Sequence, residues 1–161
     1  MTLGDPAGIG PELIAKLLSN ASNLEKADII VLADKSEVDD AIADAGGVSV
    51  PIAPKSGPKA VHILDDGTGP KTRGQRAEVT EAGGARCLHQ LRRALKLQEA
   101  GEIDAIVFAP LNKSSLKKAG MTQEDELRWF ADQLNFDGTT SEINIAGKLW
   151  TGRVTSHIGI E

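Results

Sequence analysis

The chain is poor in the residues on which several classes of protein depend. Its 161 residues include one cysteine, Cys87, which excludes an internal disulfide and a zinc site built from cysteines. No apolar run approaches the length of a membrane-spanning helix and no signal peptide is visible, so we predict a cytoplasmic protein with no membrane partner. The 18 basic residues are outnumbered by 23 acidic ones, and the net charge of −5 argues against a nucleic-acid partner.

Glycine and proline, by contrast, are concentrated near the start of the chain. Residues 4–12 read Gly-Asp-Pro-Ala-Gly-Ile-Gly-Pro-Glu and are followed by leucine and isoleucine at helical spacing. This pattern predicts a very short strand, a tight loop that contains Asp5, and a helix that begins near Pro11. Glycines let a backbone approach a ligand closely and a helix N-terminus favours anions, so the loop is a candidate anion site, with an ordinary turn as the alternative. The dinucleotide-binding fingerprint is not met, because Leu13 stands where its third glycine belongs.

Segments typical of strands and of helices alternate along most of the chain. Apolar runs predict buried strands at residues 28–33 and 104–109 and another strand at residues 61–64. Residues 48–52 predict a short strand, which Pro51 places at an edge of the sheet or at a strand end. Helical spacing predicts helices at residues 11–20, from a cap at Asp34 or Ser36 to Gly46, at 75–100 with a break at Gly83-Gly84, at 113–119 and at 123–134. We therefore predict an α/β fold with a mostly parallel sheet and helices on both faces.

The last part of the chain has a different pattern. Residues 142–146 and 149–155 predict two strands joined by Gly147-Lys148, which indicates a hairpin and not another strand–helix–strand unit. We therefore divide the chain into a first α/β lobe at residues 1–121 and the start of a second lobe at residues 122–161.

Two later positions carry side chains suited to a phosphorylated substrate and to a metal. Lys113 follows Asn112 at the carboxyl end of the strand predicted at residues 104–109, where ligands gather in open α/β sheets. An ammonium suits phosphate and Asn112 can orient a hydroxyl or a carboxylate, whereas a solvated lysine at a helix start is the alternative. His157 follows the last predicted strand. Imidazole is a common ligand of divalent metals, but a lone histidine is more often structural or exposed.

Three segments together resemble one family. Residues 4–12, residues 104–113 (Asp-Ala-Ile-Val-Phe-Ala-Pro-Leu-Asn-Lys) and residues 153–157 (Arg-Val-Thr-Ser-His) are similar, in order and spacing, to 4-hydroxythreonine-4-phosphate dehydrogenases, the pyridoxine-pathway enzymes and their relatives. The resemblance covers essentially the whole chain and implies an isocitrate/isopropylmalate dehydrogenase-like fold. Because members of the family are much longer, we expect this chain to be truncated, roughly the N-terminal half of such an enzyme.

The resemblance implies a full-length enzyme that oxidises a small phosphorylated hydroxy acid, 4-phosphohydroxythreonine or a similar compound, with NAD or NADP as the hydride acceptor. A divalent metal (zinc, magnesium, manganese or cobalt) would polarise the hydroxyl, and a β-keto acid product can then lose carbon dioxide. His157 would be one metal ligand, and Asp5, Asn112 and Lys113 would shape the substrate cleft. The resemblance also implies a homodimer, and it implies that the chain alone is inactive because the cofactor would bind mostly through the missing second half, where the other two metal histidines also lie.

One segment departs from the family. Many members have Gly-His-Thr-Glu at residues 125–128, where the histidine and the threonine contact substrate, but this chain has Glu126 and Leu127 in their place. A carboxylate there would repel a substrate carboxylate or phosphate, although Arg128 could offset this by pairing with an acid. An amphipathic helix with solvated acidic residues is the alternative. The departure favours a related dehydrogenase of phosphorylated threonate, erythronate or another hydroxy acid.

Two further functions stay open. An acyl transferase such as phosphate acetyltransferase shares the general fold and needs no metal, but the histidine after the last predicted strand argues against it. A non-catalytic half-domain would keep the anion-binding loop and a dimer surface. Finding the remaining metal histidines in downstream coding sequence would exclude this second alternative.

Overall fold

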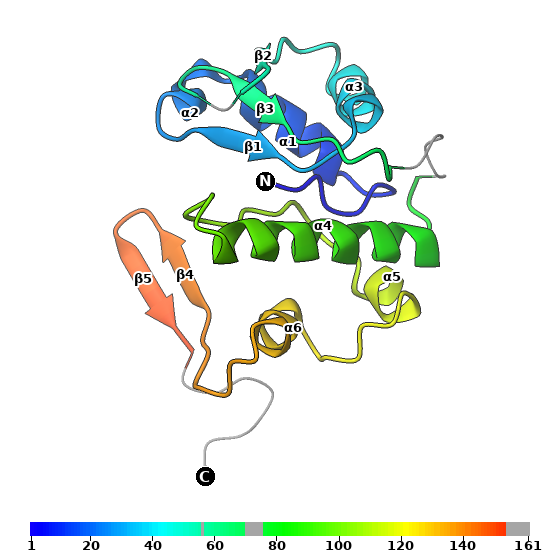
Figure 1. Ribbon diagram of the computed structural model, residues 1–161, viewed down its shortest axis with the longest axis vertical. Helices are drawn as coiled ribbons and strands as arrows, with labels where there is room; N and C mark the ends of the chain where they lie inside the picture. Colours follow the sequence, from blue (N-terminus) through cyan, green and yellow to red (C-terminus); the bar gives the residue numbers. More distant parts are fainter. Residues whose placement is uncertain (56, 70–75, 154–161) are drawn as a thin grey trace. The chain divides into compact units, whose positions relative to one another are not determined.

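The computed structural model of the chain describes residues 1–55, 57–69 and 76–153 (Figure 1). It contains two compact units, Met1–Gly120 and Met121–Glu161. A parallel sheet with helices forms the first unit, and a helix and an antiparallel hairpin form the described part of the second. Within the described ranges, no helix combines the length and the apolar character that crossing a membrane requires.

A small parallel sheet forms the centre of the first unit. Its three strands lie in the order β1 (Ile29–Val31), β3 (Val61–Ile63) and β2 (Ile52–Ala53). Thr2 extends the sheet beyond β1, because it makes parallel bridges to Leu32 on one side and to Phe108 on the other. The first residues of the chain therefore lie inside the sheet, as the very short strand that the sequence predicts.

The described part of the first unit has five helices, which are α1 (Gly10–Ser19), α2 (Ala21–Leu24), α3 (Lys35–Asp44), α4 (Glu81–Glu99) and α5 (Lys113–Lys118). Three of them are capped by a side-chain oxygen that accepts a backbone N–H group of the first turn. The capping residues are Asn20 at α2, Thr80 at α4 and Asn112 at α5. At α3, the carboxylate of Glu37 accepts the N–H of Asp34 at 2.8 Å, one half of a capping box. The sequence therefore marks most helix starts locally.

Helices pack on both faces of the sheet, as predicted. The buried hydrophobic core joins β1 and β3 to α1 and α3, and it consists of Leu3, Ile14, Leu18, Leu24, Ile29, Val31, Ala33, Val38, Val61 and Ala109. Neighbouring side chains of an extended segment point to opposite faces, so Leu32 faces away from Val31. Leu32 lines a hollow together with Cys87 of α4, which places α4 on the face opposite α1.

Residues 104–109 do not form the buried strand that their apolar sequence predicts. Phe108 makes a single bridge to Thr2, and the N–H of Thr2 donates to the carbonyl oxygen of Val107 at 3.0 Å. Ala109 is buried, but Val107 and Phe108 are 48% and 39% exposed. A continuous apolar run is typical of a strand that other elements bury on both faces. Among the described residues, only Ala109 of this segment is buried in that way.

Helix α4 begins later than predicted and is not interrupted at its glycines. The sequence predicts a helix over residues 75–100 with a break at Gly83-Gly84, but α4 runs without a break from Glu81 to Glu99. A Cβ atom on Gly84 would lie 1.9 Å from the carbonyl oxygen of Ser115 in α5. The glycine therefore permits a close approach of two helices and does not end one.

The edge strand β2 also lies further along the chain than the strand predicted at residues 48–52. It begins at Ile52, directly after Pro51, whose carbonyl oxygen accepts the N–H of Val61 at 2.8 Å. Proline has no N–H to give to a sheet, so it suits the position just before an edge strand.

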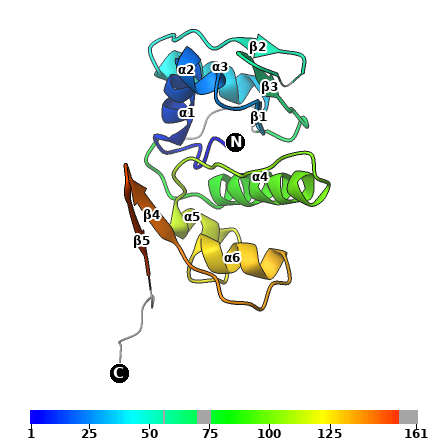
Figure 2. The same ribbon diagram turned by 90° about the vertical axis from the view of Figure 1, so that its left-hand side faces the viewer.

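The second unit contains α6 (Glu126–Gln133) and a hairpin of β4 (Ile143–Ala146) and β5 (Leu149–Gly152), which Figure 2 shows as a pair of adjacent arrows. Asp125 caps α6 by accepting the N–H of Arg128 at 2.8 Å. Gly147, with a φ of 61°, supplies the turn of the hairpin. The predicted hairpin is present, and the end of its second predicted strand lies outside the described residues.

Candidate active site

The glycine-rich loop (residues 4–10) is held tightly against the segment that leads to Lys113. Gly4 has a φ of 73°, and a Cβ atom there would lie 2.5 Å from the carbonyl oxygen of Pro110. A Cβ atom on Gly10 would lie 2.4 Å from the carbonyl oxygen of Leu3. Gly4 is required because its backbone is left-handed, and Gly10 is required because the backbone of Leu3 lies too close for a side chain. The N–H of Asp5 also donates to Pro110 at 3.0 Å, so the loop is fixed next to residues 110–113.

Asp5 turns its carboxylate inward. The side chain is 5% exposed, and its Oδ1 atom accepts the N–H of Ala7 at 3.0 Å. The same oxygen would lie 3.3 Å from a Cβ atom on Gly83, in the first turn of α4. In this conformation Asp5 therefore stabilises the loop. A direct contact of Asp5 with substrate stays a prediction.

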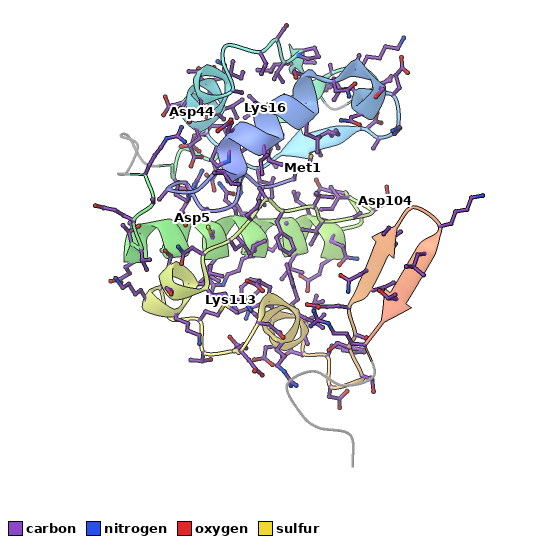
Figure 3. The ribbon with its side chains drawn as sticks, turned by 180° about the vertical axis from the view of Figure 1, so that it is seen from behind. Met1, Asp5, Lys16, Asp44, Asp104 and Lys113 are labelled. Carbon is purple, nitrogen blue, oxygen red and sulfur yellow. The ribbon has the colours of Figure 1, made fainter. Side chains whose placement is uncertain are left out.

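Asn112 and Lys113 lie at the start of α5. The side-chain oxygen of Asn112 accepts the N–H of Ser115 at 3.1 Å, which leaves its amide NH₂ as the group that a ligand could use. Lys113 is exposed, and its ammonium pairs with no other described residue. Figure 3 shows Asp5 in the loop before α1 and Lys113 at α5, with α4 between the two labels in this view.

The first turn of α4 connects these two parts of the candidate site. The N–H of Thr80 donates to the hydroxyl of Ser115 at 3.2 Å, and the ammonium of Lys118 donates to the carbonyl oxygen of Val79 at 3.0 Å. Gly83 and Gly84 lie so close to Asp5 and to α5 that a Cβ atom would come within 3.3 Å of the Asp5 carboxylate and within 1.9 Å of the Ser115 carbonyl oxygen. The candidate site therefore consists of the glycine-rich loop, the start of α4 and the start of α5. Its exposed cation at Lys113 and its amide donors are suited to a phosphate or a carboxylate.

Glu126 and Leu127 lie in the first turn of α6, in the second unit, and both are half-buried. The guanidinium of Arg128 lies 4.0 Å from the carboxylate of Glu124, and these side chains are 63% and 52% exposed. Such an exposed pair contributes little stability. Whether Glu126 and Leu127 contact substrate stays a prediction.

A buried cluster of charges surrounds Arg86 in α4, and the sequence patterns described above do not predict it. The Arg86 side chain is 8% exposed, and its guanidinium donates to Glu37 at 3.0 Å and 2.5 Å, to Asp34 at 3.3 Å and to the hydroxyl of Thr68 at 2.9 Å. These contacts join α3, the segment after β3, and α4. The sequence does contain a signal for this cluster, because Arg86 lies one turn before Gln90 on the face of α4 that is buried. An arginine on a buried helix face requires acidic partners.

Asp34, which pairs with Arg86, shares a hydrogen bond with Asp65, and the pKa values of the two carboxyl groups shift in opposite directions. Burial raises the pKa of Asp34, and the hydrogen bond to Asp65 acts in the same direction, against the N–H of Gly69 and the charge of Arg86. The pKa of Asp65 is lowered, chiefly because its carboxylate accepts the N–H of Lys35 at 2.9 Å. Asp34 is therefore the partner that keeps a proton more readily.

Asp66 completes an acidic group in which oxygens of Asp34, Asp65 and Asp66 lie within 4.8 Å of one another, as ligands of a metal ion could. Burial favours a higher pKa for Asp66, but hydrogen bonds from Thr68 and His89 and the charge of Arg93 lower that pKa well below its usual range. All three carboxylates already accept protein donors. We therefore interpret the group as a structural ion-pair network.

The predicted metal ligand, His157, lies outside the described residues. The two other histidines have protein partners: the Nδ1 atom of His62 is 3.4 Å from the carbonyl oxygen of Ala53, and the Nε2 atom of His89 is 2.7 Å from the carboxylate of Asp66. Both partners suit a structural role. The prediction of a metal ligand at His157 stays untested by the described residues.

Cys87 is not a nucleophile in this environment. Burial, with a smaller contribution from the charge of Asp5, raises the pKa of its thiol to about 12. The thiolate is the reactive form of cysteine, so the thiol of Cys87 is inert at neutral pH.

Comparisons with known proteins agree with the resemblance stated above. The family described as "Pyridoxal phosphate biosynthetic protein PdxA" matches residues 15–161. Over 172 residues the chain is 43% identical to "Putative 4-hydroxythreonine-4-phosphate dehydrogenase 2" of Pseudomonas aeruginosa, covering 99% of this chain and 49% of that protein. Over 168 residues it is 27% identical to the "D-threonate 4-phosphate dehydrogenase" of Bordetella bronchiseptica, covering 99% of this chain and 47% of that protein.

The fold agrees as well. The crystal structure of a 4-hydroxythreonine-4-phosphate dehydrogenase from Burkholderia phymatum matches with a TM-score of 0.83 and 28% identity, over 98% of this chain and 49% of that one. The chain thus spans about half the length of the relatives that it matches. The resemblance that three segments predict is confirmed.

Proposed function

We propose, from the premise that the chain belongs to the family of the pyridoxal phosphate biosynthetic protein PdxA, that the whole protein is a dehydrogenase of a small phosphorylated hydroxy acid. The observation that carries the proposal is the family match over residues 15–161. Because relatives are named for 4-hydroxythreonine 4-phosphate, this compound or a close analogue is the first candidate substrate.

The geometry of the first unit supports an anionic substrate. Lys113 offers an exposed ammonium that pairs with none of the residues the structure describes, and the amide of Asn112 lies next to it in the chain. The glycine-rich loop is fixed beside them through Pro110. In this proposal Lys113 binds the phosphate or carboxylate, Asn112 orients the substrate, and Asp5 contributes through the loop that it stabilises.

A second candidate substrate, phosphorylated threonate or erythronate, is favoured by two observations. Some relatives are named D-threonate 4-phosphate dehydrogenases. This chain also has Glu126 and Leu127 where the resemblance implies a histidine and a threonine that contact substrate. A carboxylate at position 126 would change the charge and the hydrogen bonds that a substrate meets, and it would therefore change substrate preference.

The cofactors also belong to the proposal. NAD or NADP would accept the hydride, and a divalent metal with His157 as one ligand would stabilise the alkoxide form of the substrate hydroxyl. One histidine cannot form a tight site, since catalytic metal sites use about three protein ligands. The described carboxylates of Asp34, Asp65 and Asp66 do not fit this role, because protein donors already use them.

The remaining expectations from the resemblance are proposals of the same kind. They include a homodimer, a cytoplasmic location, the relation of the fold to isocitrate and isopropylmalate dehydrogenases, and loss of carbon dioxide from a β-keto acid product. We also expect the 161-residue chain to show no dehydrogenase activity by itself, because one metal histidine is too few.

The decisive experiment joins this chain to the second half of the Pseudomonas aeruginosa relative. Reduction of NAD or NADP would be measured with 4-phosphohydroxythreonine, D-threonate 4-phosphate and D-erythronate 4-phosphate, with and without a metal chelator. We expect chelator-sensitive turnover by the fusion protein and none by the chain alone. The preferred substrate among the three decides between the two candidates.

Lysine variants of the fusion protein test the site. Lys113→Met removes the ammonium proposed to bind substrate and should raise KM by about tenfold or more, as the loss of a charged contact does. Lys117→Met, in the same helix, is the matched control and should leave KM unchanged. A folded fusion protein that turns over none of the three substrates, under conditions in which the intact relative is active, would exclude the proposal.

A further inference from the structure

Two buried polar atoms in the first unit have no hydrogen-bond partner among the described residues. They are the Oγ1 atom of Thr2 and the Nε2 atom of Gln90, in side chains that are 2% and 4% exposed. Folded proteins pair nearly all such atoms, with protein groups or with ordered water. Two unpaired atoms in one place therefore point to a ligand.

Thr2 and Gln90 line the same hollow. It measures about 230 Å³, including the part that is open to solvent, and it lies between the first residues of the chain, Leu32 and α4. Gly4, the first residue of the glycine-rich loop, is in its wall, and so are Glu37, Arg86 and Cys87. Only about 10 Å³ of this space can hold the centre of a water molecule, which is close to the minimum that one water needs.

Arg93 determines which end of the Gln90 amide faces the hollow unpaired. Its guanidinium donates to the Oε1 atom of Gln90 at 2.8 Å, which fixes the orientation of the amide and leaves the NH₂ group as the unpaired end. The hydroxyl of Thr2 can donate one hydrogen bond and accept others. A ligand in the hollow must therefore accept a hydrogen bond from the Gln90 amide. It must also donate a hydrogen bond to the Thr2 hydroxyl or accept one from it.

The charges around the hollow favour a neutral ligand. Arg86 is already matched by Glu37 and Asp34, and Glu37 itself forms part of the wall, so an anion would meet a carboxylate. A cation would meet the amide hydrogens of Gln90. A small neutral molecule that both donates and accepts hydrogen bonds meets neither obstacle.

We propose that this hollow is an internal water site, in which bound water accepts a hydrogen bond from Gln90 and bridges to the hydroxyl of Thr2. The bridge connects the segment that enters the glycine-rich loop to α4, whose first turn lies close to Asp5 in that loop. The water thereby helps to position the loop against α4. The proposal is independent of the dehydrogenase function, since it concerns the 161-residue chain without substrate or cofactor.

A high-resolution crystal structure of the chain tests the site directly. We expect a water within hydrogen-bond distance of both the Thr2 Oγ1 and the Gln90 Nε2 atoms. In solution, oxygen-17 relaxation dispersion should count fewer long-lived waters in the double variant Thr2→Val with Gln90→Met. A direct bond between the two side chains would overturn the proposal. So would a bound anion, which a bromide soak would show by its anomalous signal, or an unchanged count of long-lived waters.

Stability measurements give a second test. Each single variant should lower the midpoint of denaturant unfolding, and the double variant should lower it by less than the sum, because both side chains bond to the same water. Thr2→Ser retains the hydroxyl and should keep the water, while Thr151→Val, at an exposed threonine of the hairpin, is the matched control. Strictly additive losses would contradict a shared water.

Discussion

The parallel sheet of the first unit and the hairpin of the second use similar side chains with opposite results. Val31 and Val61 in the sheet are 0% and 1% exposed, whereas Ile145 and Trp150 in the hairpin are 59% and 66% exposed. All described residues of β4 and β5 are exposed. The apolar side chains of Ile143, Ile145 and Trp150 nevertheless share one face of the hairpin, as its register requires.

The difference shows that residues close in the sequence can determine how two strands pair, whereas burial of a strand depends on elements that are distant in the sequence. Register in a hairpin depends on residues a few positions apart, so β4 and β5 pair as the sequence predicts. Burial of a strand requires helices that come from elsewhere in the chain, and α1 and α4 provide them for β1. An isolated two-stranded hairpin is marginal in water, so this face of the hairpin would gain stability from any apolar cover.

The largest effect should come from breaking the buried ion pairs of Arg86 in the first unit, with an exposed ion pair of the second unit as the comparison. Arg86→Met leaves the buried carboxylates of Glu37 and Asp34 unmatched, and we expect a loss of about 3 to 5 kcal/mol in the free energy of unfolding. Arg153→Met breaks the pair with Glu142, whose side chains are 50% and 44% exposed, and should cost less than about 1 kcal/mol. Urea unfolding measures both, and equal losses would contradict the comparison.

A methyl group added to a glycine should also destabilise the first unit more than the second. Gly84→Ala places a Cβ atom 1.9 Å from the backbone of Ser115, and we expect a loss of about 2 to 3 kcal/mol from overpacking. Gly152→Ala, at the end of β5, meets nothing within 4 Å and should be nearly neutral. Thermal unfolding followed by circular dichroism measures the difference. If Gly84→Ala were as stable as the unchanged protein, α4 and α5 could move apart with little loss in the free energy of unfolding, which would contradict this prediction.

Acid should weaken the first unit through Asp66. The folded protein lowers the pKa of this carboxyl, so the stabilisation is complete above its ordinary value of 3.8 and is lost as the pH falls through the folded-state pKa. Asp66→Asn should lower stability at neutral pH by about 1 kcal/mol and flatten the acid side of the profile. Urea midpoints between neutral and acidic pH test this, with Glu142→Gln in the second unit as the control. An unchanged acid side would mean that Asp66 is not the responsible group.

The smallest effect should lie in the hairpin itself. Ile145 and Trp150 are directly paired across the two strands, and such exposed pairs contribute about 0.5 kcal/mol. A double-mutant cycle with alanine at both positions measures this coupling. A coupling of about 2 kcal/mol or more would indicate that another surface covers this face in solution.

Much of the fold follows from short-range patterns. The cap at Asn112, the proline at the start of α1 and the glycine turn of the hairpin all act within a few residues, and the sequence predicts these three elements correctly. The glycine-rich loop and the segment at residues 104–113 also led to the family. Local patterns were therefore enough for many of the elements, and the resemblance of three short segments was enough for the family.

What the sequence could not predict depends on contacts between distant residues. The role of Gly84 appears only when α5 is packed against it, and Arg86 meets Glu37 across 49 positions. The exposure of Val107 and Phe108 is a property of the surroundings and not of their own side chains. For the candidate site, the inward turn of Asp5 and the capping role of Asn112 likewise needed the neighbouring backbone.

The place of Thr2 between Leu32 and Phe108 has a consequence for synthesis on the ribosome. Translation adds about 5 to 20 residues per second, so Phe108 is made roughly 5 to 20 seconds after Thr2. During this interval the first residues can pair with β1 but have no neighbour on their other side. Contacts between residues so far apart in the chain form slowly. The nascent chain therefore exposes an open sheet edge, next to the glycine-rich loop, until the segment after α4 emerges.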